Sequence, residues 1–161
     1  MSWGFQAVAR ERVSRYGAGM TPMSPPGLVL HVEDDAEQRE SLAMVLQLAG
    51  FRAYGAESAA AALDAARRLR DELDVLIVDY HLGDEDTGTE VAESVARVLG
   101  HAVPTVILTG DPANAGIPVL TNAPVWLLRK PARTDVLTSA LPSLVALRRA
   151  VRSVVMAGPH Y

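Results

Sequence analysis

Five short, mostly apolar runs, separated by longer stretches of mixed character, are the feature that most constrains the fold of this chain. They lie at 28–32 (LVLHV), 51–55 (FRAYG), 75–79 (VLIVD), 104–109 (PTVILT) and 125–128 (VWLL). Runs of this length, in which nearly every residue is apolar, are typical of strands covered on both faces. The sequence therefore predicts an α/β fold with a parallel sheet between two layers of helices.

The stretches between these runs carry apolar side chains at helical spacing. Helices are expected at 36–49, 59–72, 89–100 and 133–156. Ser58 is suited to cap the second helix, and Gly50 to end the first. Pro142 lies inside the last stretch, where it is expected to kink or break the helix. Five strands joined by right-handed crossovers predict a flavodoxin-like, doubly wound sheet of order 2-1-3-4-5.

The length of 161 residues fits one domain with some additional chain. We divide it into an N-terminal extension or linker at 1–26, with a short helix at 4–16, a compact domain at 27–150, and a C-terminal tail or helix extension at 151–161. The net charge is −4 with both signs mixed, which gives no indication of a nucleic-acid surface. No apolar run approaches the roughly 20 residues of a membrane span. Cysteine is absent, which excludes disulfides and thiolate catalysis. We expect a cytoplasmic protein without membrane or nucleic-acid partners.

Ionisable and hydroxyl side chains follow the apolar runs directly. Glu33 and Asp34 come after the first run, Asp79 ends the third, Thr109 ends the fourth, and Lys130 follows the fifth. In a doubly wound sheet the functional crevice lies outside the carboxyl ends of the strands, so these side chains should converge. Asp35, the next residue after the acidic pair, is better suited to cap the first helix than to hold a metal.

A group of carboxylates in one crevice suggests a bound cation. Carboxylates close together repel one another, and a hard cation such as Mg²⁺ relieves that repulsion by taking oxygen ligands. Lys130 is the only lysine of the chain, and its ammonium is a compact point charge suited to a phosphate oxygen. A carboxylate nucleophile, Mg²⁺, an ammonium and a hydroxyl together suit phosphoryl transfer to an aspartate.

Residues 28–150 resemble a response-regulator receiver domain of two-component signalling. The resemblance rests on four motifs in order: LVLHVEDD, DVLIVDYHL, PTVILTG and LLRKP. Each motif is weak alone, whereas their order and spacing are specific. The combination is closest to receivers of hybrid histidine kinases or to free-standing single-domain regulators.

The resemblance implies a metal site and a phosphoacceptor. Asp79 corresponds to the aspartate that takes the phosphoryl group. Glu33 and Asp34 correspond to the acidic pair that holds Mg²⁺, with Asp34 as a direct ligand. Asp79 and the backbone carbonyl of His81 would complete the protein ligands.

The resemblance also implies roles for the ends of the last two strands. Thr109 corresponds to the hydroxyl that moves toward the acyl phosphate, and Lys130 to the lysine that contacts it. Pro131 would follow that lysine through a cis peptide bond. The implied partners are a sensor histidine kinase or a histidine phosphotransfer protein, and a downstream protein. The last helical stretch, rich in apolar side chains, also suggests a homodimer.

Two departures from the family pattern stand out. Leu127 occupies the position where many members carry a tyrosine or phenylalanine that swings inward on activation. The segment 110–124, GDPANAGIPVLTNAP, contains three prolines and no helical stripe, so the helix expected there, the fourth of the family, should be shortened or missing.

Three functions are consistent with these residues. The first is a phosphoacceptor switch in a phosphorelay, without turnover of a separate substrate. The second is a pseudo-receiver that only binds partners, which Leu127 and the altered segment favour slightly. The third, an aspartate-nucleophile phosphohydrolase, fits poorly because such enzymes carry the nucleophile on the first strand.

Overall fold

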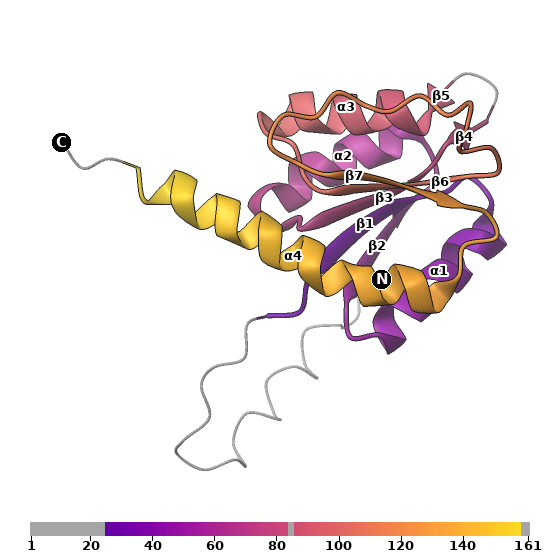
Figure 1. Ribbon diagram of the computed structural model, residues 1–161, viewed down its shortest axis with the longest axis horizontal. Helices are drawn as coiled ribbons and strands as arrows, with labels where there is room; N and C mark the ends of the chain where they lie inside the picture. The colour runs from indigo at the N-terminus through magenta and orange to yellow at the C-terminus, as the bar shows by residue number, and fades with distance from the viewer. Residues whose placement is uncertain (1–24, 84–85, 159–161) are drawn as a thin grey trace, which may run out of the picture.

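The computed structural model describes residues 25–83 and 86–158. Within them a five-stranded parallel sheet has the order β2-β1-β3-β6-β7 (Figure 1). Its strands are β1 (Leu28–Val32), β2 (Arg52–Ala56), β3 (Val75–Asp79), β6 (Thr105–Thr109) and β7 (Val125–Arg129). In chain order this is 2-1-3-4-5, which confirms the predicted doubly wound sheet. The helix expected at 4–16, and most of the predicted N-terminal extension, lie outside the described residues.

Helices cover both faces of the sheet. They are α1 (Ala36–Leu48), α2 (Ala59–Leu69) with the 3₁₀ turn η1 (Arg70–Glu72), α3 (Gly88–Leu99) and α4 (Thr134–Met156). α2 and α3 lie on one face, α1 and α4 on the other (Figure 1). Asp35 caps α1 by accepting from the Gln38 N–H, and Ser58 caps α2 as predicted. α1 ends before Gly50, with Ala49 as its C-cap.

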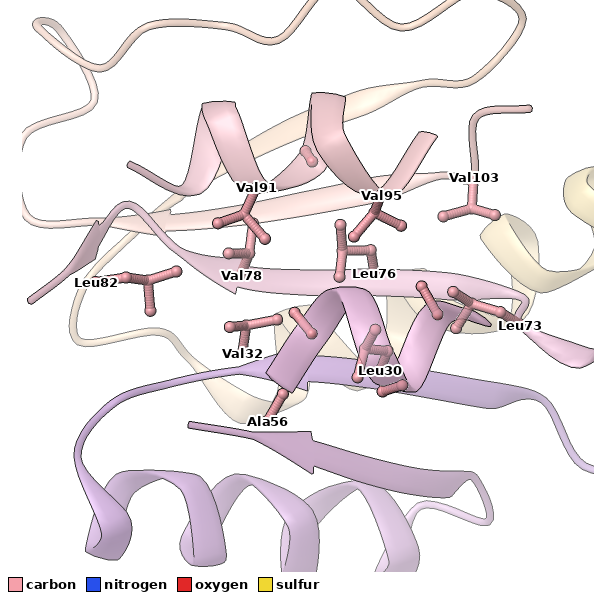
Figure 2. Packing of buried hydrophobic residues seen from close by; sticks show 14 of the residues in the cluster. Leu30, Val32, Ala56, Leu73, Leu76, Val78, Leu82, Val91, Val95 and Val103 are labelled. Carbon is pink, nitrogen blue, oxygen red and sulfur yellow. The ribbon is translucent and has the colours of Figure 1, made fainter. Parts of the chain in front are cut away.

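Each face of the sheet carries its own apolar core. On one face, Leu30, Val32, Leu76 and Val78 from the central strands pack against α2 and α3 (Figure 2). On the other face, Val29, Val75 and Ile77 of the same strands pack against α1 and α4. Successive side chains of a strand point to opposite faces, and covering both explains why the runs are apolar throughout.

The sequence predicted a kink or a break of the last helix at Pro142. The helix does not break there: α4 is continuous from Thr134 to Met156. Proline removes one intrahelical donor, but Pro142 is exposed, so water can reach the freed carbonyl. Leu141 and Leu144 on either side of it are buried against the sheet and hold both halves in line. The last turns of α4 run beyond the edge of the sheet (Figure 1).

The segment between β6 and β7 contains no helix; all of its residues, 110–124, are described and form turns and irregular chain. This confirms the predicted loss of a helix. The segment is tied to its neighbours by polar contacts instead. The Gly116 N–H donates to the Tyr80 hydroxyl over 3.1 Å, and the Thr89 hydroxyl donates to the Gly116 carbonyl over 2.6 Å.

A small antiparallel pair, β4 (His81–Leu82) and β5 (Asp86–Thr87), follows β3 and was not predicted. It is too short to leave a periodic signal in the sequence. Among the residues that the structure describes, no helix is long and apolar enough to cross a membrane.

Candidate functional site

The carboxyl ends of β1, β3, β6 and β7 bring the predicted site residues together. Glu33 follows β1, and its N–H donates to the carbonyl at the end of β2. Asp79 ends β3 opposite Leu108, so Thr109 lies one residue further along the neighbouring strand. The carbonyl of Thr109 accepts from the Lys130 N–H over 2.8 Å, which fixes the start of the Lys130 side chain.

Lys130 lies between the carboxylates of two strands. Its Nζ is 2.8 Å from Oδ2 of Asp79 and 3.3 Å from Oε2 of Glu33. The Oε1 atom of Gln38 also accepts from it at 3.3 Å. The peptide bond between Lys130 and Pro131 is cis, as the resemblance implied. All three protons of the ammonium therefore have an oxygen partner.

Three carboxylates meet beside this ammonium. One oxygen from each of Glu33, Asp34 and Asp79 lies within 4.8 Å of the others. Glu33 and Asp79 are buried, whereas Asp34 is exposed and opens the group to solvent. A set of carboxylate oxygens that is accessible from one side suits a hard divalent cation such as Mg²⁺. The residues present therefore fit the expected ion.

The electrostatics of the group follow from its crowding. Burial raises the pKa of Glu33, and the negative charge of Asp79 raises it further. Burial acts to lower the pKa of Lys130, but its hydrogen bond and charge interaction with Asp79, and the charge of Glu33, raise it overall. Burial also acts against ionisation of Asp34, whose pKa is nevertheless lowered by hydrogen bonds, including one from the Gly83 N–H. The lysine thus stays charged and the three carboxylates carry excess negative charge.

Thr109 and His81 occupy different surroundings. Thr109 is buried, and its hydroxyl accepts from the N–H of Asp111 over 3.2 Å, at the start of the helix-free segment. His81 lies in β4 with its side chain exposed. The use of its carbonyl as a metal ligand stays a prediction. Leu127 is half-buried and packs on the core beside α3.

Four residues of the site were missed by sequence reasoning. Gln38 contacts Lys130, and the Arg39 guanidinium donates to the Glu33 carbonyl over 2.8 Å. The Tyr80 hydroxyl holds the helix-free segment. Gly88 gives its N–H to the Tyr80 carbonyl over 2.7 Å. Only Gln38 left a signal, since Asp35 and Gln38 have the spacing of a capping box.

Comparison with known proteins points to one family. The model of the response regulator receiver domain matches residues 29–142. A search of curated proteins gave no match.

Several solved structures are similar over most of this chain. A receiver domain protein of Clostridium thermocellum is 18% identical with a TM-score of 0.64, covering 78% of this chain and 98% of its own. The chemotaxis protein CheY4 of Vibrio cholerae is 26% identical with a TM-score of 0.60, covering 74% and 98%. The receiver domain of the hybrid histidine kinase CckA is 24% identical with a TM-score of 0.60, covering 74% and 99%.

Gly88 should be intolerant of substitution. A Cβ at this position would lie 2.5 Å from the carbonyl oxygen of Asp79, which is backbone and cannot swing away. We expect Gly88→Ala to lower the free energy of unfolding by about 1–3 kcal/mol, as overpacking does, when measured by urea denaturation. Gly110→Ala is the control, because a Cβ there meets no atom within 4 Å. Equal stability of the two variants would contradict this account of Gly88.

Proposed function

We propose that this chain, which belongs to the response regulator receiver domain family, is a phosphoacceptor switch. In this proposal Asp79 takes a phosphoryl group from the phosphohistidine of a sensor kinase or a phosphotransfer protein. The observation that carries the proposal is the Lys130 ammonium, 2.8 Å from Asp79 within a group of three carboxylates. A strand-end aspartate with only a structural role needs neither the lysine nor the other two acids.

The transfer step can be written from these residues. An oxygen of the Asp79 carboxylate attacks the phosphorus, the bond from phosphorus to the imidazole nitrogen breaks, and an aspartyl phosphate forms. The imidazole leaves with the electron pair of that bond and takes up a proton. Lys130 loses its ion pair with the free carboxylate and pairs with a phosphoryl oxygen instead, so the charge brought by the group is neutralised in place.

Receiver domains generally bind Mg²⁺ at an acidic pocket, and the acidic group described above supports the same role here. Glu33, Asp34 and Asp79 would hold the ion. When bound, Mg²⁺ supplies positive charge that offsets the phosphoryl oxygens. Asp34 is the member exposed to solvent, and through it the ion would enter.

Phosphorylation of Asp79 would alter the protein surface through Thr109. Its hydroxyl accepts from the Asp111 N–H, and a hydroxyl can also donate one hydrogen bond. A phosphoryl oxygen on Asp79 offers a strong acceptor for that proton. Movement of Thr109 toward it would pull on Asp111 and the helix-free segment 110–124, altering the surface that a downstream partner contacts.

A pseudo-receiver, which binds partners without phosphotransfer, is the second candidate. It is supported by Leu127, which cannot act as a switching aromatic ring. The complete set of acids with Lys130 and Thr109 favours phosphotransfer over it. The third candidate, an aspartate-nucleophile phosphohydrolase, is supported only by the residue types that such enzymes share with this site. A cytoplasmic location, and a homodimer formed through the exposed apolar side chains near the end of α4, also remain proposals.

Phosphorylation at Asp79 is the direct test. We expect phosphoramidate, whose P–N bond matches that of phosphohistidine, to label the wild type in the presence of Mg²⁺. Asp79→Asn should not be labelled, because an amide is a poor nucleophile, whereas Asp86→Asn, an exposed aspartate on β5, should be labelled normally. The labelled fraction is measured by intact-protein mass spectrometry. Equal labelling of Asp79→Asn would sink the assignment, and absence of label on the wild type together with no beryllofluoride binding would favour the pseudo-receiver.

Mg²⁺ should stabilise the protein through Asp34. Ligand at about a hundred times its Kd adds roughly 2.7 kcal/mol of stability, so Tm should rise by roughly 5 °C or more. We expect Asp34→Asn to remove most of this rise in a thermal melt. Asp35→Asn should keep it, because asparagine also serves as an N-cap and Asp35 is outside the acidic group. The same rise in both variants would rule out Asp34 as a ligand.

The shape of Lys130, beyond its charge, should matter. A guanidinium is a broad planar fork, and it cannot occupy the position of an ammonium that has three oxygens within 3.3 Å. We expect Lys130→Arg to slow phosphoramidate labelling by about tenfold or more. Arg129→Lys, the reverse exchange at the exposed neighbouring residue, should label at the wild-type rate. Normal labelling of Lys130→Arg would show that charge alone is required.

A further inference from the structure

A pocket of about 500 Å³ lies at the amino-terminal end of the sheet, away from the acidic group. It is bounded by the end of α3, the last turns of α4 and residues 119–122 of the helix-free segment. Its apolar wall consists of Ala96, Val119, Leu120, Val151, Val155 and Met156. Its polar side chains are two buried or half-buried guanidinium groups, one imidazole, and four groups at the exposed rim: Arg148, Arg152, His101, Asp71, Arg97, Thr121 and Asn122. The volume is in the range of small-molecule sites.

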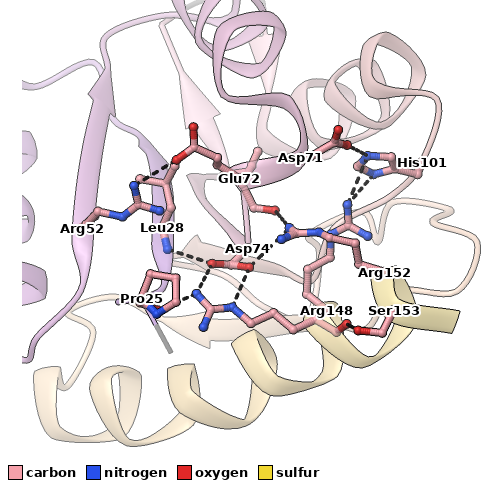
Figure 3. A network of polar contacts seen from close by, with 12 residues as sticks. Pro25, Leu28, Arg52, Asp71, Glu72, Asp74, His101, Arg148, Arg152 and Ser153 are labelled. Carbon is pink, nitrogen blue, oxygen red and sulfur yellow. Dashed lines mark hydrogen bonds and ion pairs between the residues drawn. The ribbon is translucent and has the colours of Figure 1, made fainter. Parts of the chain in front are cut away.

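The buried carboxylate nearest this pocket is already neutralised. Asp74 is 1% exposed and accepts from the Leu28 N–H over 3.0 Å (Figure 3). Arg149 and Arg152 both form ion pairs with it, at 3.0 and 3.4 Å. Two guanidinium groups therefore share one carboxylate, and Asp74 has no ion pair with Arg148.

Arg148 is a buried cation without a counter-ion among the described residues. It is 6% exposed, and its Nε has no hydrogen-bond partner there. Its only polar partner in the described part of the chain is His101, whose ring nitrogens lie 3.1 and 3.2 Å from one guanidinium nitrogen (Figure 3). Asp71 and Asp74 act on Arg148 only at longer range.

His101 does not compensate the charge of Arg148. Burial lowers the pKa of His101, and the positive charge of Arg148 lowers it further. The imidazole is thus neutral near pH 7 and has one nitrogen able to accept. Burial, together with the charge of Arg152, also lowers the pKa of Arg148. A buried charge that is left unpaired costs several kcal/mol, and an anion in the adjoining pocket would recover much of that cost.

We propose that this pocket binds a small organic monoanion, whose carboxylate pairs with Arg148 and whose apolar body lies against α4 and residues 119–122. Arg148 is the buried guanidinium of the pocket with no carboxylate at ion-pair distance among the described residues, whereas Arg152 is engaged by Asp74, so one carboxylate is assigned to Arg148. The apolar wall calls for a hydrocarbon body rather than a sugar. The segment between β6 and β7, which contains no helix, places irregular chain and a turn at 119–122, and these residues form one side of the pocket.

Octanoate is a suitable probe, with octanol and octylamine as uncharged and cationic controls of the same length. The full chain, unphosphorylated and without Mg²⁺, is titrated with each and followed by two-dimensional ¹H–¹⁵N NMR. We expect octanoate to shift the backbone signals of Val119, Leu120 and Val151 and the Nε–H signal of Arg148. It should bind at least about tenfold more tightly than either control, as loss of one charge-assisted hydrogen bond implies. Signals around Asp79 should not move.

Substitution of the guanidinium tests its role. Arg148→Met keeps an apolar stem of similar length and should bind octanoate no better than octanol. Without ligand it should unfold at the same urea concentration as the wild type or a higher one, because no ion pair is lost. Arg67→Met is the matched control, since Arg67 pairs with Asp64 on the exposed side of α2, and it should bind octanoate like the wild type.

A second variant decides the case if Arg148→Met does not fold. Val151→Trp fills the pocket without changing its charge, and it should abolish the octanoate shifts. The proposal is overturned if octanoate and octanol bind alike, if Arg148→Met or Val151→Trp binds octanoate normally, or if the shifts fall elsewhere. A dimer in sedimentation that Arg148→Met dissociates would assign Arg148 a protein partner and would also overturn it. None of these outcomes depends on phosphorylation of Asp79.

Discussion

Three carboxylates repel one another at the carboxyl ends of the strands, and one ammonium partly offsets that repulsion. The arrangement of the candidate site depends on this balance. Glu33, Asp34 and Asp79 come from two different strands, and their oxygens lie within 4.8 Å of one another. Lys130 reaches them from a strand at the sheet edge. The doubly wound topology is what makes this meeting possible, because it places the carboxyl ends of all the strands at one edge. The apolar core on both faces holds those ends in register, and the excess of carboxylates over ammonium groups makes the crevice suited to a cation.

The backbone around Asp79 is fixed by close packing and by hydrogen bonds of residues that lie outside the acidic group. Gly88 approaches the Asp79 carbonyl so closely that no side chain fits between them. Tyr80, the next residue, extends its hydroxyl to Gly116 in the segment that replaces a helix. Asp79 and the segment 110–124 are therefore connected through two neighbouring residues at the end of β3. In this molecule the segment 110–124 is attached to the site by hydrogen bonds rather than by a packed helix, so it can shift without repacking a core.

The order of strands and helices and the acids, threonine and lysine at the strand ends could be predicted from the sequence, because each depends on local pattern and on topology. The missing helix could be predicted for the same reason, since prolines at 112, 118 and 124 exclude a regular stripe. The contacts of Arg39 and Gly88 could not be predicted, because they depend on which backbone atoms the fold brings close to these two residues. The hairpin of β4 and β5 is too short for periodicity. The break considered at Pro142 does not occur, because the exposure of the proline and the core contacts of its neighbours, rather than helix propensity, decide whether the helix continues.

The length of α4 has a mechanical consequence. At 1.5 Å per residue its 23 residues span about 34 Å. It starts a few residues after Lys130 and ends beside the pocket at the opposite edge of the sheet. Leu141 and Leu144 pack the middle of the helix onto the sheet, while its last turns run beyond the edge of the sheet (Figure 1). Because the helix is packed on the sheet only over its first part, a small change of its angle at the end near Lys130 would move its last turn by a larger distance.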